Sequence, residues 1–250
     1  MEKQQIPENN FHLEIYLLAI RYLSDIFMIS IRYLIGALMS YSIAIAHSKG
    51  GTGKTTTATQ LVDVLNIRRI ADIDIHKGLS VINSLRPDDR QWEILDISSK
   101  EQLAKAIAET HEKGSLLIDC GGFDSEMTRV AIALADLVLT PANDDITEQL
   151  GLASFNRTLA EISRIKGEKV IAHVLMTRVH PSRKNFKAIT DAINELEHLS
   201  MMTSHLSNRS IYPSVMAESG SGVTSYIGTN HSEAGKEVRR LAEEVKTLIG

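Results

Sequence analysis

The most informative segment of this chain is the glycine-rich run Lys49-Gly50-Gly51-Thr52-Gly53-Lys54-Thr55-Thr56. Its glycines lack a Cβ atom, so backbone N–H groups can approach an anion and the chain can adopt positive φ angles. A short apolar run at residues 42–47 predicts a buried strand before the loop, and residues 55–65 predict a helix after it. The first N–H groups and the dipole of that helix would face the same anion. Strand, glycine loop and helix in this order predict a phosphate-binding site.

The loop carries the side chains that a triphosphate needs. Lys54 followed by Thr55 matches the lysine and hydroxyl by which P-loops bind the terminal phosphates and Mg²⁺. The strict pattern has a glycine six residues before the lysine, and Ser48 stands there, so the match fails at one position. The alternative is a chance glycine turn before a helix. Lys49 adds a second lysine whose simplest alternative role is a solvated loop charge.

Composition narrows the class of protein. The 250 residues are 43% hydrophobic and 23% charged, which is ordinary for a globular chain and enough for one α/β domain with a sizeable core. The single cysteine, Cys120, excludes an internal disulfide framework and a cysteine-rich metal or iron–sulfur site within one chain. It fits a reducing compartment, and we expect a cytoplasmic protein.

Charge is unevenly placed along the chain. The net charge is −4, so the overall balance does not indicate nucleic-acid binding. Between Glu168 and Asp191, however, there is no acidic residue. The basic residues of this segment are Lys169, Arg178, Arg183, Lys184 and Lys187. Such a segment is either a nucleic-acid surface or an ordinary solvated helix face.

Apolar runs alternate with helical patterns from residue 39 to the C-terminus. Strands are expected at 42–47, 69–73, 92–97, 115–119, 137–140, 170–176 and 201–206, and helices at 55–65, 100–113, 126–135, 146–165, 184–196 and 233–249. Near-continuous apolar strands between amphipathic helices are typical of a parallel sheet covered on both faces. We therefore expect a doubly wound, mainly parallel α/β fold, with residues 39–250 as one domain.

Carboxylates follow two of these strands, at the edge of such a sheet where ligands bind. Asp119 ends one strand, and a carboxylate there can hold Mg²⁺ through the ion's water shell; its alternative role is to cap a helix. Asp74 closely follows another strand, and its neighbour Asp72 is expected to be structural. Asp124 is expected to cap the helix that begins after it.

A lysine directly before the Gly-Gly pair resembles the deviant Walker A loop of the ParA/MinD superfamily of P-loop ATPases. The resemblance implies ATP and Mg²⁺ as ligands, with the nucleotide bound by residues 49–56. It implies that Lys49 reaches across a dimer interface to the nucleotide of the other subunit, where it acts in catalysis with Lys54. The first residue of the family's loop is often not glycine, so Ser48 is no serious departure.

The resemblance also assigns the carboxylates. Asp119 resembles the Walker B aspartate, and Thr55 and Asp74 would join it around Mg²⁺. Asp74 matches the aspartate that positions or activates the attacking water. Ile75 and His76 stand where the family has Pro-Gln, which puts the geometry of this loop in doubt.

Weaker similarities extend the resemblance over residues 39–250. Thr177 and Arg178 end a strand that resembles the one near the adenine in short plasmid-type ParA proteins. Arg209 falls in a late loop that resembles the one close to the base, and its alternative role is a surface charge. The resemblance thus adds these three residues to the nucleotide site.

The implied function is a ParA-like ATPase with weak basal activity that drives plasmid or chromosome partition. Such proteins dimerise on ATP, bind DNA non-specifically on the nucleoid and are stimulated by a ParB-like centromere-binding protein. The candidate DNA surface comprises Arg178, Arg183, Lys184 and Lys187. The alternatives are a MinD-like membrane-associated positioning ATPase and an accessory ATPase switch for conjugation or cluster positioning.

Residues 1–38 allow more than one interpretation. Residues 11–38 are apolar but interrupted by Glu14, Arg21, Asp25 and Arg32, whose spacing places them on one helical face. The segment is either an upstream extension of the reading frame, with Met39 as the natural start, or an amphipathic helix for a membrane surface or partner. A spanning anchor is weakly supported because no uncharged run of 18 residues exists. Membrane binding would have to use residues 11–38.

Overall fold

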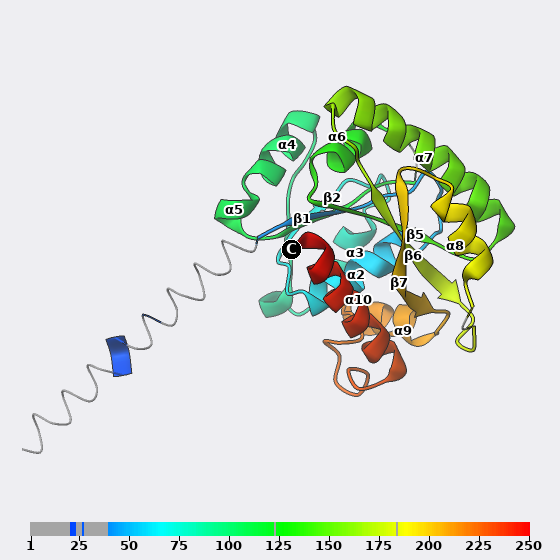
Figure 1. Ribbon diagram of the computed structural model, residues 1–250. Coiled ribbons are helices and arrows are strands. Elements are labelled where there is room, and N and C mark those ends of the chain that lie inside the picture. The colour runs from blue at the N-terminus through cyan, green and yellow to red at the C-terminus, as the bar shows by residue number, and fades with distance from the viewer. Residues whose placement is uncertain (1–20, 24–26, 28–39, 123, 184) are drawn as a thin grey trace, which may run out of the picture. The chain divides into compact units, whose positions relative to one another are not determined.

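A computed structural model describes residues 21–23, 27, 40–122, 124–183 and 185–250 (Figure 1). Tyr41–Gly250 forms one compact unit that is distinct from Met1–Ser40. The predictions for residues 1–38 lie almost entirely outside the described residues and stay predictions. Within the described part of the chain, no helix combines the length and apolarity that crossing a bilayer requires.

The core of Tyr41–Gly250 is a parallel sheet with strand order β3-β2-β4-β1-β5-β6-β7 (Figure 1). Every neighbouring pair in this order is parallel. The strands are β1 Ser42–Ile45, β2 Arg69–Asp72, β3 Glu93–Ile94, β4 Leu116–Asp119, β5 Leu137–Ala142, β6 Ala172–Val179 and β7 Leu199–Ser207. The predicted doubly wound α/β fold is confirmed, and the described sheet is wholly rather than mainly parallel.

Helices cover both faces of this sheet (Figure 1). They are α2 Lys54–Val64, α3 Gly78–Ser84, α4 Lys100–Ala108, α5 Thr110–Lys113, α6 Glu126–Leu134, α7 Ile146–Lys166, α8 Lys187–Asn194, α9 Ile211–Ser219 and α10 Glu233–Ile249. Apolar side chains of α4, α6, α7 and α8 pack on one face. Those of α2, α3, α9 and α10 pack on the other.

The strand at the centre of the sheet shows how the sequence builds two cores. Ile43 and Ile45 of β1 belong to the cluster on the α2 face, whereas Ala44 and Ala46 belong to the cluster on the α7 face. All four are fully buried. Because successive side chains of a strand point to opposite faces, a continuous apolar run is needed when both faces are covered.

Several predicted elements differ in the structure. The helix expected at 100–113 breaks at Glu109 into α4 and α5. β5 continues beyond the predicted end at residue 140, through Pro141 to Ala142. β1 pairs with β5 only as far as Leu139, so the missing N–H of Pro141 removes no bond to β1. α3 and α9 are short and were not predicted.

The predicted cap of α6 is also wrong. Ser125, not Asp124, is the N-cap, and its hydroxyl accepts a hydrogen bond from the Thr128 N–H. Asp124 instead pairs with Arg129 on the first turns of the same helix. Serine and aspartate cap helices about equally well, so adjacent Asp-Ser leaves the choice to the backbone conformation.

Candidate functional site

The glycine loop connects the end of β1 to the start of α2, as predicted. Gly51 and Gly53 have φ angles of 78° and 98°, a region that favours glycine. Gly53 is the N-cap residue of α2, and no side chain caps this helix end. The first N–H groups of α2 are thus left for an anion from outside the chain.

Gly122, in the loop after β4, packs closely against the backbone of the glycine loop. A Cβ atom at Gly122 would lie 2.9 Å from the backbone N of Gly50 and 3.2 Å from the carbonyl carbon of Lys49. Only glycine permits this approach without a shift of one backbone. The loop that follows the Asp119 strand therefore supports the phosphate-binding loop directly.

Lys54 is the first residue of α2 and is buried, with its amine folded back over the loop. Its Nζ donates to the Lys49 carbonyl oxygen at 3.1 Å. This positive charge in a glycine cradle is the central feature of a phosphate site. The predicted pair of lysines is therefore present on one loop, with Lys54 inside it and Lys49 at its rim.

Asp119 lies at the end of β4 beside this loop and is fully buried. Neither carboxylate oxygen has a hydrogen-bond partner among the described residues. Burial raises the pKa of Asp119 to about 7; Asp72 and Asp74 add to the rise, while Thr55 and Lys54 oppose it. A buried carboxyl with unused oxygens next to the Thr55 hydroxyl fits a Mg²⁺ site, because hard oxygen ligands are what this ion prefers.

The same site lacks a dedicated metal cage. Within the part of the chain that the structure describes, no cluster of three or more His, Cys, Asp or Glu side chains is arranged to hold a metal. Mg²⁺ at nucleotide sites is characteristically held by one or two protein oxygens, waters and substrate phosphates. Thr55 and Asp119 supply that limited set.

Asp72 and Asp74 have different environments. Asp72 pairs in register with Asp119, and one of its oxygens accepts from both the N–H and the hydroxyl of Ser80 at 2.9 Å. Asp74 lies in the loop after β2, where its Oδ1 accepts from the His76 N–H at 2.8 Å. In this way His76 contributes a backbone donor that fixes the direction of the Asp74 carboxylate.

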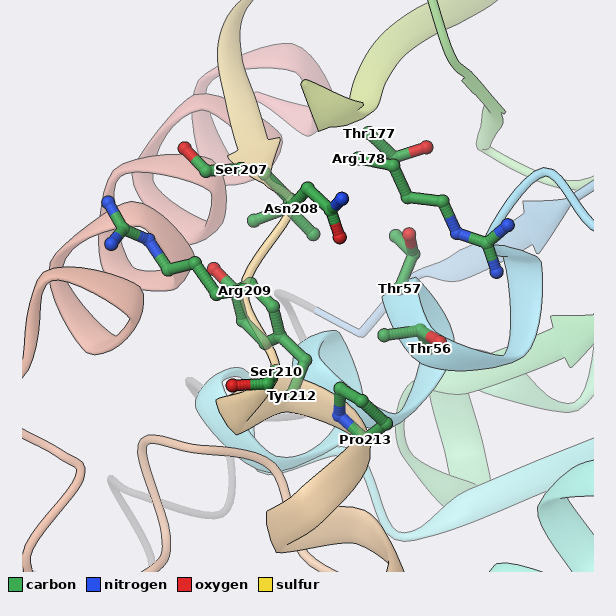
Figure 2. A pocket seen from close by; sticks show the side chains of 12 residues that line it. Thr56, Thr57, Thr177, Arg178, Ser207, Asn208, Arg209, Ser210, Tyr212 and Pro213 are labelled. Carbon is green, nitrogen blue, oxygen red and sulfur yellow. The ribbon is translucent and has the colours of Figure 1, made fainter. Parts of the chain in front are cut away.

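Two cavities meet at the loop. One, of about 460 Å³, is bounded by the glycine loop, Asp74–His76 and Gly122. The other, of about 430 Å³, lies between the first turn of α2, the end of β6 and the segment 206–213 (Figure 2). Gly53, Thr56 and Arg178 line both. One end of the combined space is rich in phosphate-binding groups, and the other has the size and apolar walls of a site for a base and sugar.

Thr177 and Arg178, the residues predicted to lie near the base, line the cavity beside the segment 206–213, and Arg178 also lines the other cavity. The Thr177 hydroxyl donates to the Thr52 carbonyl oxygen at 2.8 Å, which fastens β6 to the glycine loop. Arg178 has a φ angle of 56°, an uncommon backbone conformation for a residue with a side chain. Figure 2 shows its side chain extending over Thr56 and Thr57.

Arg209 lines the second cavity, but its guanidinium is engaged elsewhere. It donates to the buried carboxylate of Glu237 from Nε at 3.1 Å and from Nη2 at 2.9 Å. Figure 2 shows the side chain directed away from Thr56 and Thr57. Glu237 also accepts from Ser207 and from the Tyr212 hydroxyl. The structure therefore places Arg209 in the wall of the cavity through its backbone and stem.

Glu237 was not identified from the sequence, although a signal was present. It lies on the apolar face of α10 with Ala234, Val238 and Leu241, all buried. A carboxylate on an apolar helix face requires partners to offset its burial. Here the partners come from the segment 207–212, whose path it fixes.

Lys49 contacts the first turn of α7 in its own chain. Its Nζ donates to the Thr147 hydroxyl at 2.9 Å and lies 3.5 Å from Glu148 Oε2. The side chain is 43% exposed, whereas Glu148 is fully buried. His47, also fully buried, lies 2.8 Å from the other oxygen of Glu148. Neither His47 nor Glu148 was singled out from the sequence.

The candidate DNA residues do not all have free charges. Arg183 pairs with Asp144 and lies over the Phe186 ring, 5.5 Å from its centroid. Lys187 begins α8 and is exposed. Lys184 lies outside the described residues. The basic segment is therefore partly neutralised by Asp144, a feature that the one-dimensional charge pattern could not show.

A comparison with known protein families matches most of the chain, including the glycine loop. Residues 43–215 match the CobQ/CobB/MinD/ParA nucleotide binding domain family. The chain belongs to this family. The superfamily resemblance predicted from the Lys49 loop is thereby confirmed, and ATP hydrolysis is the activity of its ParA/MinD-type ATPases.

Individual relatives agree with this assignment. A ParA protein of Rhizobium radiobacter is 28% identical over 145 residues, which make up 56% of this chain and 65% of that protein. The chain thus matches slightly less than two thirds of that relative's length. A septum site-determining MinD of Pyrococcus horikoshii, complexed with Mg-ADP, superposes with a TM-score of 0.61 at 18% identity, covering 84% of this chain and 97% of that one.

A putative plasmid partition protein of Borrelia burgdorferi, bound to AMPPNP, gives a TM-score of 0.57 at 18% identity, covering 83% and 99% of the two chains. At these identities the structural likeness shows the fold alone. The nucleotides are properties of those two proteins.

Proposed function

We propose that this member of the ParA/MinD-type ATPases dimerises on binding ATP and hydrolyses it to drive plasmid or chromosome partition. The observation that carries the proposal is the arrangement of the two lysines. Lys54 is buried within the glycine cradle, whereas Lys49 stands at its rim and is 43% exposed. Lys54 therefore serves the nucleotide of its own chain, whereas Lys49 can reach a second subunit once it leaves its contacts with α7.

The residues present suit transfer of the γ-phosphoryl group to water. The α2 N–H groups and Lys54 bind the phosphates and offset their charge, while Thr55 and Asp119 would hold Mg²⁺. Bound Mg²⁺ would supply further positive charge to the phosphates. Asp74, oriented by the His76 N–H, positions the attacking water in line with the bond to the leaving ADP. Lys49 of a second subunit supplies charge to the transition state, so turnover requires the dimer.

The test separates nucleotide binding from dimerisation. The affinity of Lys49→Ala for Mg-ATP should lie within about threefold of wild type, since Lys49 does not contact the nucleotide of its own chain in the proposed dimer. Its dimerisation affinity and its hydrolysis rate should each fall by at least about tenfold. Sedimentation velocity with a non-hydrolysable ATP analogue and a phosphate-release assay measure the two effects. Lys166→Ala, which removes an exposed lysine at the far end of α7, is the matched control. A monomeric wild type with full activity would refute the proposal.

DNA is the surface we propose for the ATP-bound dimer, with Arg178, Arg183, Lys184 and Lys187 as contacts. A centromere-bound ParB-like partner would then stimulate hydrolysis and release the dimer, which would cycle between cytoplasm and nucleoid. Co-sedimentation with DNA and with liposomes, each with and without ATP, distinguishes this role from a membrane-positioning one. DNA binding should require ATP and weaken by roughly tenfold or more between 50 and 200 mM salt, because phosphate contacts release counterions. ATP-dependent binding to liposomes alone would favour a MinD-like role.

A further inference from the structure

His47 occupies an unusual position for a buried histidine. It lies two residues after the end of β1, and its ring is fully enclosed between the phosphate loop and α7. The Nδ1 atom accepts the backbone N–H of Lys49 at 2.9 Å, so Nδ1 carries no proton and Nε2 carries one. That Nε2 lies 2.8 Å from Glu148 Oε1. A single ring therefore joins the backbone of the loop to a carboxylate on another element.

The ring is held in place by α7 itself. Phe155 stacks on it with a centroid separation of 5.8 Å and an interplanar angle of 9°. Gly151 leaves room for it, because a Cβ atom there would lie 3.1 Å from the His47 Cε1 atom. Next to the ring, the Ser48 hydroxyl donates to the Gly151 carbonyl oxygen at 3.1 Å. The residues just before the glycine loop therefore pack against the first turns of α7.

Glu148 depends on two residues of the loop for its polar contacts. Both of its oxygens are buried, and neither makes a regular hydrogen bond within the described residues. One oxygen faces His47 at 2.8 Å, and the other faces the Lys49 amine at 3.5 Å. Burial raises the pKa of Glu148, but the contact with His47 and the positive charge of Lys49 outweigh it, and the pKa lies below its usual range. The ionised carboxylate therefore attracts Lys49 toward its own chain.

We propose that His47 and Glu148 form a buried clamp that retains Lys49 against α7 of its own chain, and that release from this clamp limits its transfer to a second subunit. The inference rests on the proposed function for the second step only. Thr147 supplies an outer contact, while His47 is a positioning residue that sets the orientation of Glu148. Movement of α7 relative to the loop is thereby coupled to the availability of Lys49.

The clamp is tested first in the nucleotide-free chain, without reference to dimerisation. Glu148→Gln keeps the volume and a group facing His47 but removes the charge that attracts Lys49. Acetylation of Lys49 by an N-hydroxysuccinimide ester, followed by mass spectrometry, should be several-fold faster than in wild type, at least about threefold. Thr147→Ala, an exposed change that leaves the core intact, should give a smaller increase. Glu161→Gln, at an exposed site farther along α7, should give none.

The role of His47 has its own readout. His47→Phe keeps the stacked ring and removes both nitrogens, so the Lys49 amide should exchange with deuterium at least about tenfold faster. His47→Gln, which can accept from the Lys49 N–H and donate toward Glu148, should restore much of the protection. His47→Phe leaves the buried Glu148 carboxylate without its histidine partner and could prevent folding. In that case the acetylation measurements on Glu148→Gln and Thr147→Ala still test the clamp. Unchanged acetylation of Lys49 in Glu148→Gln would overturn the clamp.

The second step is measured with a non-hydrolysable ATP analogue and Mg²⁺. The protein concentration at which Glu148→Gln dimerises should be roughly threefold to tenfold lower than for wild type. Lys49 no longer has to leave the Glu148 carboxylate in this variant. Faster acetylation without tighter dimerisation would overturn the claim that release is limiting. A wild-type chain that never dimerises would instead remove the proposed function, while the acetylation result would still stand as evidence for or against the clamp.

Discussion

Asp119 is a carboxyl group whose surroundings shift its pKa well above the usual range. It is fully buried, its oxygens have no hydrogen-bond partner among the described residues, and its pKa is raised to about 7. In the metal-free folded protein it therefore holds a proton that the unfolded chain releases near pH 4. The group's contribution to stability is complete below the unfolded pKa and is lost as pH rises through about 7.

The stability of the metal-free protein should therefore depend on pH through Asp119. The free energy of unfolding of wild type, measured in urea with a chelator present, should fall between about pH 4 and pH 7 by more than that of Asp119→Asn. The difference is bounded by the pKa shift at on the order of 4 kcal/mol. Mg²⁺ with a nucleotide should restore stability to wild type at high pH, where the carboxylate is charged. Parallel pH profiles of the two proteins would show that Asp119 ionises in the folded state at its ordinary pKa.

At the residue scale, short-range sequence patterns predicted the residues of the candidate site. Lys54, Thr55 and Asp119 were proposed because each stands next to a strand or glycine run with a fixed spacing. His47, Glu148 and Glu237 were missed because their partners are far away in the chain: Glu148 is about 100 residues from both His47 and Lys49. Only the packing of α7 on the loop reveals why a buried histidine and glutamate are tolerated there.

At the element scale, the strands and long helices were predictable because their apolar periodicity is imposed by burial on both faces. The boundaries and short helices were not. α3 begins after Lys77, which has a φ angle of 49°, and is only Gly78–Ser84. Its placement depends on tertiary contacts: a Cβ at Gly78 would lie 3.0 Å from the Thr55 methyl, and Arg86 just beyond the helix pairs with Asp63 of α2. Local sequence carries little of this information.

The contact between the loops after β1 and β4 gives a prediction at this scale. Gly122→Ala places a Cβ 2.9 Å from the Gly50 nitrogen, so one backbone must move. We expect a stability loss of about 1–3 kcal/mol in urea unfolding, since overpacking has this cost, and at least about tenfold weaker Mg-ATP binding by calorimetry. Gly50→Ala is the control for stability, because its Cβ meets no atom within 4 Å and its φ angle is not positive. A Gly122→Ala protein that binds Mg-ATP as wild type would show that the cradle tolerates the shift.

At the scale of the whole molecule, the candidate nucleotide site and both hydrophobic cores lie within Tyr41–Gly250. The sheet places β1 between β4 and β5, so the glycine loop, Asp119 and the first turn of α7 gather at one edge. Ligands of open α/β sheets bind at such an edge, where the strand order reverses.

Residues 1–38 are expected to be dispensable for folding and for nucleotide binding. A chain shortened to begin at Met39 should remain soluble, with a melting temperature within about 2 °C of the full chain, because none of the described core residues precedes Ser40. Mg-ATP affinity should agree within about twofold, since every described group of the site follows Tyr41. Lys54→Ala in both lengths is the control and should abolish binding in each. An insoluble short chain, or one that loses nucleotide binding, would show that residues 1–38 complete the fold. If only liposome binding is lost, these residues act as the amphipathic membrane helix that their charge spacing allows.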